Sequence, residues 1–436
     1  MANTYLTRTF ASAGTATKFT LSAWIKRSGI STQQTIMSRY VTANKYVKIL
    51  INNANQLEYG VYNNNQGGYQ ARYETSALFR DTSAWYHIVV AQDSSLGTAA
   101  DRVKFYINGN LVTSFATNTQ IGQNVAGDFN NATAHQIGAY NGADFFDGLI
   151  SHFHFCDNQQ YAASTFGSVD STTGEWKINP SPSVSYGTSG FLILKDGNTI
   201  TDQSANSNNW SSGGGTLTTT KDCPSNVLAT LNPLIKTYGT QVFSNGNTSS
   251  INSTNEPAWS HAIATLGAST GKYYWEIKVS GATPWIWTGI ISEAVDVRTQ
   301  YLYNSNAGTF LYGNNGKKYL NASAAENFFA TLATNDIVSV ALNLDDNKIT
   351  FYKNGTATPN ATPLDLPTNL SSTTVFPATT IVNGASIKSN FGNGFFGTTA
   401  ITTNSGNGYA GAEGASKFNY QPPSGYSSLS TKGLNQ

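Results

Sequence analysis

Apolar and polar residues alternate along most of this chain with a period of two. In the segment KFTLSAWIKRS (residues 18–28), Phe19, Leu21, Ala23 and Ile25 share one parity. Successive side chains of a β-strand point to opposite faces, so such a run predicts a strand with one buried face. Similar runs recur along the chain, and no segment has the spacing of an amphipathic helix. The pattern therefore predicts an all-β fold of many short strands, arranged as sandwiches or barrels.

Two of these runs end in the same motif, Phe-Tyr-x-Asn-Gly. The motif lies in RVKFYINGN, with its turn at Asn108 and Gly109, and again in KITFYKNGT, with its turn at Asn354 and Gly355. Asn-Gly between alternating apolar runs predicts a tight hairpin, because both central residues of the turn need a positive φ. The flanking sequences diverge, so we interpret the motif as one structural hairpin used by two different sandwiches.

Changes in composition divide the chain into four segments. They are a first sandwich (1–165), a connector (166–235), a second sandwich (236–400) and a C-terminal extension (401–436). The connector is rich in Gly, Ser, Pro and Asn, but Trp176, Phe191 and Trp210 give it apolar anchors that a free linker lacks. We therefore expect the connector to pack on its neighbours and the extension to close on the second sandwich.

Composition argues against several kinds of partner. Charged residues make up 11% of the chain and the formal net charge is +1, without a basic run, so nucleic acid is not an expected partner. No apolar stretch reaches the roughly 18 residues of a membrane span, and the first residues lack the form of a signal peptide. Two cysteines, Cys156 and Cys223, form neither a disulfide framework nor a zinc pattern.

Motifs that suggest catalysis fail in their context. GASTG (267–271) matches a nucleophile elbow, but it precedes a strand and no histidine follows it. GNGFFG (392–397) and GNGYAG (406–411) match a dinucleotide-binding pattern without a βαβ unit around them. His152 and His154 could begin a metal site, but a third ligand is not evident nearby. A strand carrying the paired carboxylates of a glycanase is also missing, so we expect no catalytic residue, no bound metal and no cofactor.

Aromatic clusters are the remaining candidates for a binding site. They pair Trp285 with Trp287, Tyr301 with Tyr303, and Tyr62 with Tyr69, the last pair among asparagine and glutamine residues. An exposed aromatic ring can stack on a sugar ring while neighbouring amides bind its hydroxyls. These six residues are our candidates for contact with a glycan, and inward packing into the core is the alternative for each.

With these motifs in view, each sandwich resembles a known family. LSAWIKRS, WYHIVVAQD, VKFYINGNLV and IGAYNGADFFDGLISHFHF, in this order, make residues 1–165 resemble a laminin G-like, concanavalin A-like jelly roll. GKYYWEIKV, TGIIS, YGNNGKKY and DIVSVALNLDDNKITFYKNG make residues 236–400 resemble a SPRY domain, also a concanavalin A-like sandwich. The resemblance implies two jelly-roll sandwiches in tandem.

The order of the segments resembles that of virion structural proteins of tailed bacteriophages. The segments DQSANSNNW and ATLNPL lie between the two sandwiches, and YQPPSGYSSLST lies after the second. The resemblance implies a non-enzymatic virion protein of the tail-fibre, appendage or capsid-surface type. Such a protein is located on the virion, is expected to be a homo-oligomer such as a trimer, and presents loops that bind host-surface glycan or other virion proteins. A polysaccharide depolymerase acting on host-surface glycan is the alternative function.

Overall fold

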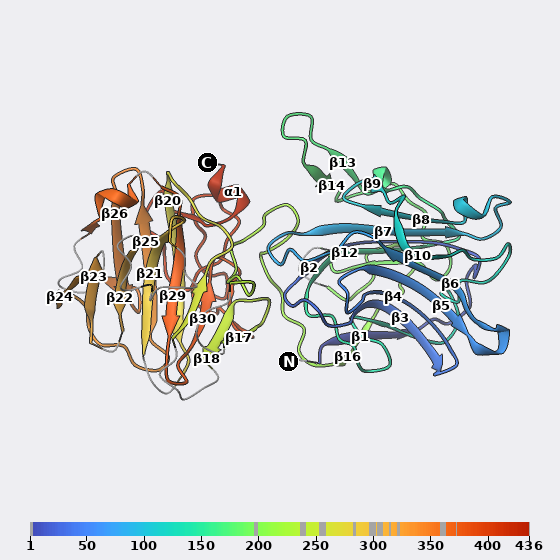
Figure 1. The fold of residues 1–436 in the computed structure, drawn as a ribbon, viewed down its shortest axis with the longest axis horizontal. Helices are drawn as coiled ribbons and strands as arrows, with labels where there is room; N and C mark the ends of the chain where they lie inside the picture. The colour runs from blue at the N-terminus through green and yellow to red at the C-terminus, as the bar shows by residue number, and fades with distance from the viewer. Residues whose placement is uncertain are drawn as a thin grey trace. The chain divides into compact units, whose positions relative to one another are not determined.

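The chain forms two compact units, Met1–Thr219 (unit 1) and Thr220–Gln436 (unit 2). The structure, a computed structural model, describes residues 3–195, 199–235, 241–252, 259–281, 285–295, 302, 308–313, 315–320, 323–357, 363–371 and 373–435. It confirms the all-β prediction: strands hold 45% of the chain and helices 4%, and each unit is built from stacked sheets (Figure 1).

In unit 1, two sheets pack face to face. The first has the order β10 (Phe115–Thr119), β6 (Gly68–Thr75), β5 (Leu57–Asn63), β4 (Lys45–Ile51), β3 (Gln34–Thr42), β11 (Ala134–Ile137), β1 (Tyr5–Thr9), β16 (Ser211–Gly214). The second has the order β15 (Phe191–Ile193), β12 (Gly148–Asp157), β2 (Lys18–Arg27), β7 (Tyr86–Asp93), β8 (Val103–Ile107), β9 (Asn110–Leu111). A separate hairpin joins β13 (Gly167–Val169) to β14 (Trp176–Ile178). Short 3₁₀ turns lie at Asn64–Gln66, Ala99–Asp101 and Ala163–Thr165.

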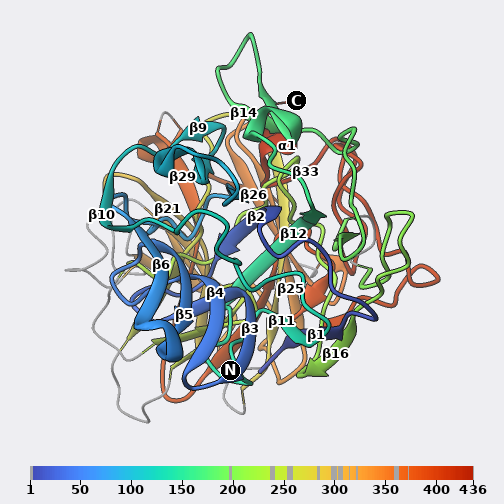
Figure 2. The ribbon, with the colours of Figure 1, turned by 90° about the vertical axis from the view of Figure 1, so that its right-hand side faces the viewer.

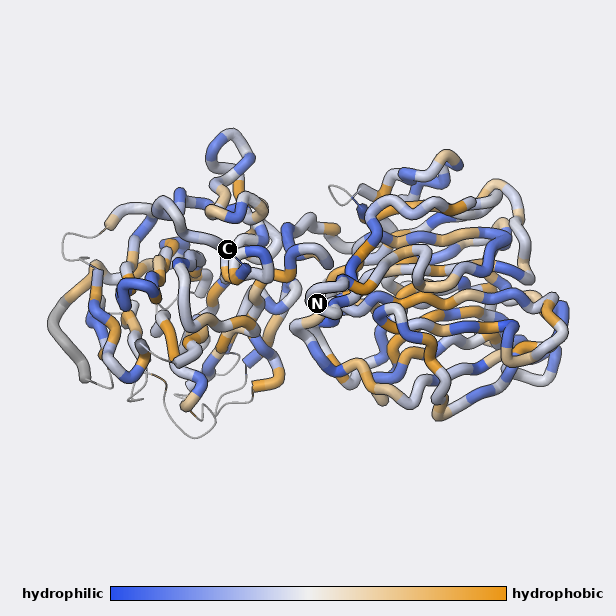
Figure 3. The backbone as a smooth tube through the Cα atoms, turned by 90° about the horizontal axis from the view of Figure 1, so that it is seen from above, coloured by the Kyte–Doolittle hydropathy of each residue, from blue (hydrophilic) through white to orange (hydrophobic). Residues whose placement is uncertain are grey.

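The core of unit 1 lies between the inner faces of these two sheets. Phe19 of β2 and Phe105 of β8 enter it from one side, and Ile49 of β4 and Tyr59 of β5 from the other, all fully buried. The alternation of apolar and polar residues along the strands is visible in Figure 3. Burying one such side chain stabilises the fold by about 1.5–3 kcal/mol, so the alternation fixes which face of each sheet is inside.

Unit 2 repeats this arrangement with different strands. One sheet has the order β17 (Gln241–Ser244), β18 (Ser249–Asn252), β30 (Ser386–Asn390), β20 (Lys272–Val279), β25 (Ile337–Asn343), β26 (Lys348–Lys353), β27 (Thr356–Ala357), with β28 (Leu364–Asp365) on β26 and β33 (Ser427–Ser428) on β20. The other has the order β19 (Ser260–Ile263), β29 (Val375–Ile381), β21 (Ile286–Ser292), β22 (Gly308–Tyr312), β23 (Lys317–Leu320), β24 (Ser323–Asn327). A short hairpin pairs β31 (Phe395–Phe396) with β32 (Thr399–Ala400), a 3₁₀ turn covers Thr368–Leu370, and α1 spans Thr431–Leu434.

The two Asn-Gly hairpins have the same local structure. The φ angles are 46° at Asn108, 84° at Gly109, 50° at Asn354 and 78° at Gly355. The Oδ1 atom of Asn108 accepts a hydrogen bond from the backbone N–H of His87 at 2.8 Å. In unit 2, Asn354 Oδ1 accepts one from the backbone N–H of Ile337, also at 2.8 Å. The asparagine thus ties the turn to the strand that precedes the hairpin.

An aromatic ring from a later segment covers the glycine of each hairpin. A Cβ atom on Gly109 would lie 2.4 Å from the ring of Trp176, and a Cβ atom on Gly355 would lie 2.4 Å from the ring of Tyr420. Trp176 begins β14, and Tyr420 belongs to the C-terminal extension. The glycine is therefore required for close approach as well as for its positive φ, and the sequence pattern predicts only the latter.

Residues 166–219 of the connector are folded into unit 1, where β15 extends one sheet and β16 the other. DQSANSNNW (202–210) holds this segment in place. The Asp202 carboxylate accepts hydrogen bonds from the backbone N–H groups of Leu192 (2.9 Å) and Asn208 (2.7 Å). The Asn208 amide donates to the carbonyl of Gly190 at 2.8 Å and accepts from the guanidinium of Arg8 at 2.6 Å. The motif is a structural clamp.

The C-terminal extension is built into unit 2. Its strand β33 pairs with β20 in parallel, and the backbone N–H of Ala229, in ATLNPL, donates to the carbonyl of Leu429 at 2.9 Å. Glu276 of β20 is fully buried and accepts hydrogen bonds from the backbone N–H groups of Asn419 (2.9 Å) and Tyr420 (2.7 Å). Both sequence segments that flank the second sandwich thus contribute to its interior.

Candidate functional site

The first sheet of unit 1 has one face turned away from the core, which we call the outer face. Along β5, Tyr59 and Val61 are buried in the core, whereas Glu58 and Tyr62 have the opposite parity and point outward. Strands β3, β4, β5 and β6 lie side by side in this sheet (Figure 2). The side chains that concern us on this face are Tyr40, Tyr46, Lys48, Glu58, Tyr62, Tyr69, Arg72, Glu74 and Tyr140.

Five tyrosines form a continuous row across the outer face, the tyrosine row. Ring centroids are 5.5 Å apart for Tyr40 and Tyr140, 5.4 Å for Tyr140 and Tyr46, 5.0 Å for Tyr46 and Tyr62, and 5.0 Å for Tyr62 and Tyr69. All five side chains are half-buried. Strand register explains their contact, because Tyr62 lies directly opposite both Tyr46 on β4 and Tyr69 on β6. The row therefore runs across the strands.

The segment GVYNNNQGGYQ (60–70) shapes one end of the row. A shift of register between Val61 and Tyr62 sets Tyr69 opposite Tyr62. Gly60 has no side chain, and a Cβ atom there would lie 3.3 Å from the ring of Tyr69. The glycine thus leaves the space into which the Tyr69 ring packs, so a larger residue at this position would displace the ring.

Two cations lie against the row. Lys48 Nζ is 5.4 Å from the ring centroid of Tyr46 and 5.1 Å from that of Tyr140. The guanidinium of Arg72 is 4.9 Å from the ring centroid of Tyr69. A cation within about 6 Å of a ring centroid is attracted by the negative face of the ring, so these contacts hold both side chains close to the tyrosines.

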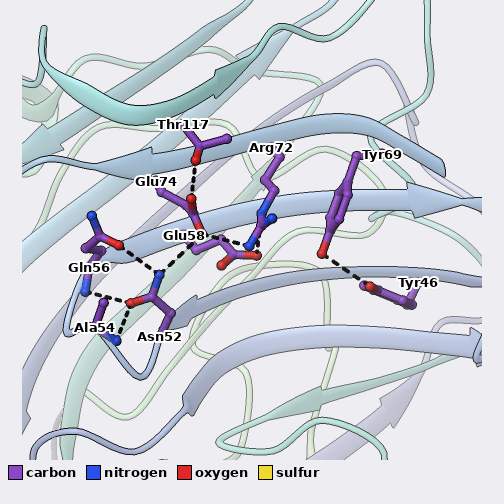
Figure 4. Close-up of polar contacts among 9 residues, drawn as sticks. All are labelled: Tyr46, Asn52, Ala54, Gln56, Glu58, Tyr69, Arg72, Glu74 and Thr117. Atoms are coloured by element: carbon purple, nitrogen blue, oxygen red, sulfur yellow. Dashed lines mark hydrogen bonds and ion pairs between the residues drawn. The ribbon is translucent and has the colours of Figure 1, made fainter.

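A pair of glutamates lies beneath Arg72. Glu58 on β5 is directly opposite Glu74 on β6, and each carboxyl group affects the pKa of the other. Arg72 forms ion pairs with both, at 2.8 Å to Glu74 and 3.7 Å to Glu58, while Thr117 and Asn52 donate to Glu74 (Figure 4). The exposed fraction of the side chain is 5% for Glu58 and 12% for Glu74, against 37% for Arg72. The Arg72 side chain is therefore more exposed to solvent than either glutamate.

The two carboxyl groups differ in acidity. Burial raises the pKa of Glu58, and the charges of Arg72 and Lys48 oppose this only in part. Burial acts in the same direction on Glu74, but the hydrogen bond from Thr117 and the charge of Arg72 outweigh it and lower the pKa of Glu74. A proton held by this pair therefore resides on Glu58.

The glutamate pair does not have the geometry of a glycoside hydrolase. The two carboxyl groups of such an enzyme flank the scissile bond, at about 5–5.5 Å in retaining and about 6.5–9.5 Å in inverting enzymes. Glu58 and Glu74 lie directly opposite each other, are largely buried and are both paired with Arg72, so they do not flank a space open to a sugar. Their observed role is to bind and orient Arg72.

In unit 2 the tryptophan candidates pack inward. Trp287 is 3% exposed and contacts Trp259 at a ring-centroid distance of 4.5 Å within a second apolar cluster. Trp285 is half-buried against the main core. Trp287 therefore offers no open face to a ligand, whereas Trp285 is half-buried, as the rings of the tyrosine row are. Tyr301 and Tyr303 lie outside the described residues.

Tyr62 and Tyr69 are the two candidates that the structure brings together. Sequence reasoning missed Tyr40, Tyr46 and Tyr140, which come from separate segments and join the row through the strand order. It also missed the glutamate pair. Aligning LEYGVYN (57–63) with YQARYET (69–75) across residues 64–68 would have placed the two glutamates opposite each other, because both strands show the same alternation.

Metal-ligating side chains and the two thiols are the other groups that could support chemistry. Among the described residues, no three His, Cys, Asp or Glu side chains are placed to hold a metal ion. His154 contacts the Tyr186 hydroxyl at 2.9 Å, and burial lowers the pKa of His154 to about 3. Cys156 and Cys223 are free thiols. In the part of the chain that the structure describes, no helix has the length and apolar character needed to cross a membrane.

Comparison with known proteins assigns a domain family to part of each unit. Residues 2–164 match the model of the concanavalin A-like lectin/glucanases superfamily, in its laminin G form, and residues 272–394 match the SPRY domain model. Both kinds of domain are mostly binding modules, although the first superfamily includes glucanases. No curated protein matches the chain.

Solved structures similar to this chain include SPRY domains. The SPRY domain of human HERC1 is 14% identical, with a TM-score of 0.30, and the match covers 36% of this chain and 96% of that one. For the TRIM65 PSpry domain the identity is 14%, the TM-score 0.30 and the coverage 37% and 88%. For stonustoxin the identity is 15%, the TM-score 0.29 and the coverage 37% and 28%.

The family matches agree with the folds described above and with the sequence resemblance of each sandwich. The predicted tandem of jelly-roll sandwiches is confirmed. This chain contains a laminin G-type concanavalin A-like domain followed by a SPRY domain.

Proposed function

We propose that this chain is a non-enzymatic carbohydrate-binding protein, and that the tyrosine row is its contact with a saccharide. The observation that carries the proposal is the row itself, five half-buried rings of which four come from the neighbouring strands β3 to β6 and one, Tyr140, from the segment after β11. Tyrosine offers an apolar ring for stacking and a hydroxyl for hydrogen bonding, so a row of tyrosines suits a ligand with apolar ring faces and polar edges.

The surroundings of the row support a sugar over a purely apolar ligand. Asn64 and Gln66 are exposed at the turn beside Tyr62, and Gln70 lies next to Tyr69. Their amides can donate to and accept from the hydroxyls of a sugar whose ring lies on the tyrosines. A small number of polar groups around an aromatic surface is typical of small-ligand sites.

The test is glycan-array screening of the full chain, followed by calorimetric titration of the best oligosaccharide. We expect Tyr62→Ala to weaken binding about fivefold or more, equivalent to about 1 kcal/mol. Tyr5→Ala is the matched control, because Tyr5 is half-buried on the same sheet but outside the row. Equal affinity of the two variants, or no binding by the unaltered chain, would reject the tyrosine row as a saccharide site.

A location on the surface of a virion is the finer part of the proposal. It is supported by the order of segments, which resembles that of tail-fibre and appendage proteins of tailed bacteriophages. Other virion proteins and a second copy of the chain are then the expected protein partners. Mass spectrometry of purified virions should detect the chain at several copies per particle, and its absence from the particles would contradict this location.

The alternative function, a polysaccharide depolymerase, is less well supported by the outer face. The carboxyl groups of Glu58 and Glu74 on this face are largely buried and are paired with the more exposed Arg72. We therefore expect the chain to bind saccharide without releasing reducing ends. A time-dependent increase in reducing ends that purification does not remove would favour the depolymerase instead.

A further inference from the structure

The charged groups of the outer face are arranged so that a ligand meets cations. Arg72 has 37% of its side chain exposed, and it covers Glu58 and Glu74, which have 5% and 12% exposed. Lys48 is half-buried beside the rings of the row. The two carboxyl groups therefore pair with Arg72 on its buried side. Lys48 and the exposed side of Arg72 are left to contact a ligand.

Among the residues that the structure describes, Lys48 has no partner of opposite charge in direct contact. Its ammonium lies over the rings of Tyr46 and Tyr140, and among the described residues no oxygen accepts a hydrogen bond from it and no carboxylate forms an ion pair with it. The carboxylates that act on it from farther away are Glu58 and Asp144. Glu58 is paired with Arg72, and Asp144 accepts a hydrogen bond from Gln33. The three N–H groups of Lys48 are thus available to an acceptor on the ligand.

The partial burial of Lys48 also favours an anion. Burial lowers the pKa of the Lys48 ammonium, and the charges of Glu58 and Asp144 oppose this only in part. A desolvated ammonium gains more from a bound anion than a hydrated one does.

From this arrangement we infer that the saccharide bound by the tyrosine row carries an anionic group, and that Lys48 binds this group while the sugar ring lies on the row. The inference rests on the proposed function and names the ligand class of the same site. A uronate carboxylate and a sulfate ester share the required chemistry. Arg72, held by the glutamate pair, forms the second cationic edge of the site.

The experiment compares matched ligands on the full chain. Oligogalacturonate, its methyl-esterified neutral form and a sulfated oligosaccharide of similar length are titrated by calorimetry. We expect one of the two anionic ligands to bind at least about tenfold more tightly than the neutral form, the effect of one charge-assisted hydrogen bond. Raising the ionic strength from about 0.01 M to about 0.15 M shortens the Debye length from about 30 Å to about 8 Å, and should reduce this advantage.

Variants then assign the effect to one side chain. Lys48→Met keeps the length and apolar stem but removes the charge, and should reduce affinity for the anionic ligand about tenfold without changing affinity for the neutral one. Lys48→Arg should restore at least half of the loss. Lys45→Met, on the same strand, is the control, because Lys45 is already paired with Asp128 at 3.4 Å. A thermal melt verifies that each variant is folded.

The outcomes separate the two proposals. Equal binding of anionic and neutral ligands, still dependent on Tyr62, would overturn the anionic specificity and leave the saccharide site intact. An anionic preference that Lys48→Met does not reduce would overturn the role of Lys48. If none of these ligands nor any glycan on the array binds, both the specificity and the saccharide site are rejected.

Discussion

The glycine of each Phe-Tyr-x-Asn-Gly motif meets two requirements because it has no side chain: a positive φ and the close approach of an aromatic ring. Turn chemistry alone predicts a positive φ there, and the structure confirms it at Gly109 and Gly355. The rings of Trp176 and Tyr420, which lie against these glycines, come from segments 67 and 65 residues farther along the chain (176 − 109 and 420 − 355). No local pattern could predict that contact.

A pair of alanine variants separates the two requirements. Gly67 has a φ of 86° with nothing within 4 Å of a Cβ atom, whereas Gly109 has a φ of 84° with Trp176 at 2.4 Å. Gly67→Ala should cost only backbone strain, about 1–2 kcal/mol. Gly109→Ala should lower the free energy of unfolding by about 1–3 kcal/mol more than Gly67→Ala does, because the ring of Trp176 must move. Urea unfolding of unit 1 measures both, and equal losses would show that the Trp176 contact contributes nothing.

Strands and turns were predictable from the sequence wherever the burial of one face imposes a local alternation of apolar and polar residues. The alternation of Phe19, Leu21 and Ile25 identified a strand because one face of it is buried. The same logic could not identify the outer face, because Tyr46 and Tyr62 become neighbours only through the pairing of β4 with β5. Nor could it show that Trp287 is buried, because that depends on a second apolar cluster over its sheet.

Strand β20 is the element in which a buried charge is tied to a neighbouring segment. Glu276 accepts hydrogen bonds from the backbone of Asn419 and Tyr420 and from the amide of Asn390 at 2.9 Å. These donors favour the carboxylate, but complete burial outweighs them and raises the pKa of Glu276 from 4.5 to about 7. In sequence, KYYWEIKV gives no sign of this, since the glutamate occupies an ordinary alternating position.

The sign of the pH dependence follows from this shift. Between pH 4.5 and about pH 7 the folded state holds a proton on Glu276 that the unfolded state has lost, so the free energy of unfolding falls as pH rises through this window. The loss is about 3 kcal/mol at most. Glu276→Gln should flatten this part of the profile for unit 2. Chemical unfolding at closely spaced pH values tests it, with Glu293→Gln, on an exposed turn, as the control. An unchanged profile in Glu276→Gln would contradict the assignment.

Each unit is completed by a segment that lies beyond its family match. In unit 1 the match ends at residue 164, yet β15, β16 and the rings of Trp176 and Trp210 come later. In unit 2 the match ends at residue 394, yet β33 and Tyr420 follow. These segments lack a long alternation of apolar and polar residues, because side-chain hydrogen bonds and a few aromatic side chains hold them against the sandwich instead. Their composition therefore resembles that of loops.

This predicts where unit 1 can be cut. A fragment of residues 1–219 should unfold cooperatively, because it retains the complete core and the Asp202 clamp. A fragment of residues 1–165 loses the pairing of β12 with β15 and uncovers Phe153 and Phe155, so a long apolar strand becomes a free sheet edge. We expect that fragment to be less stable by several kcal/mol or to aggregate, as judged by circular dichroism during thermal unfolding and by light scattering. Equal stability of the two fragments would mean that residues 166–219 do not contribute to the stability of the sandwich.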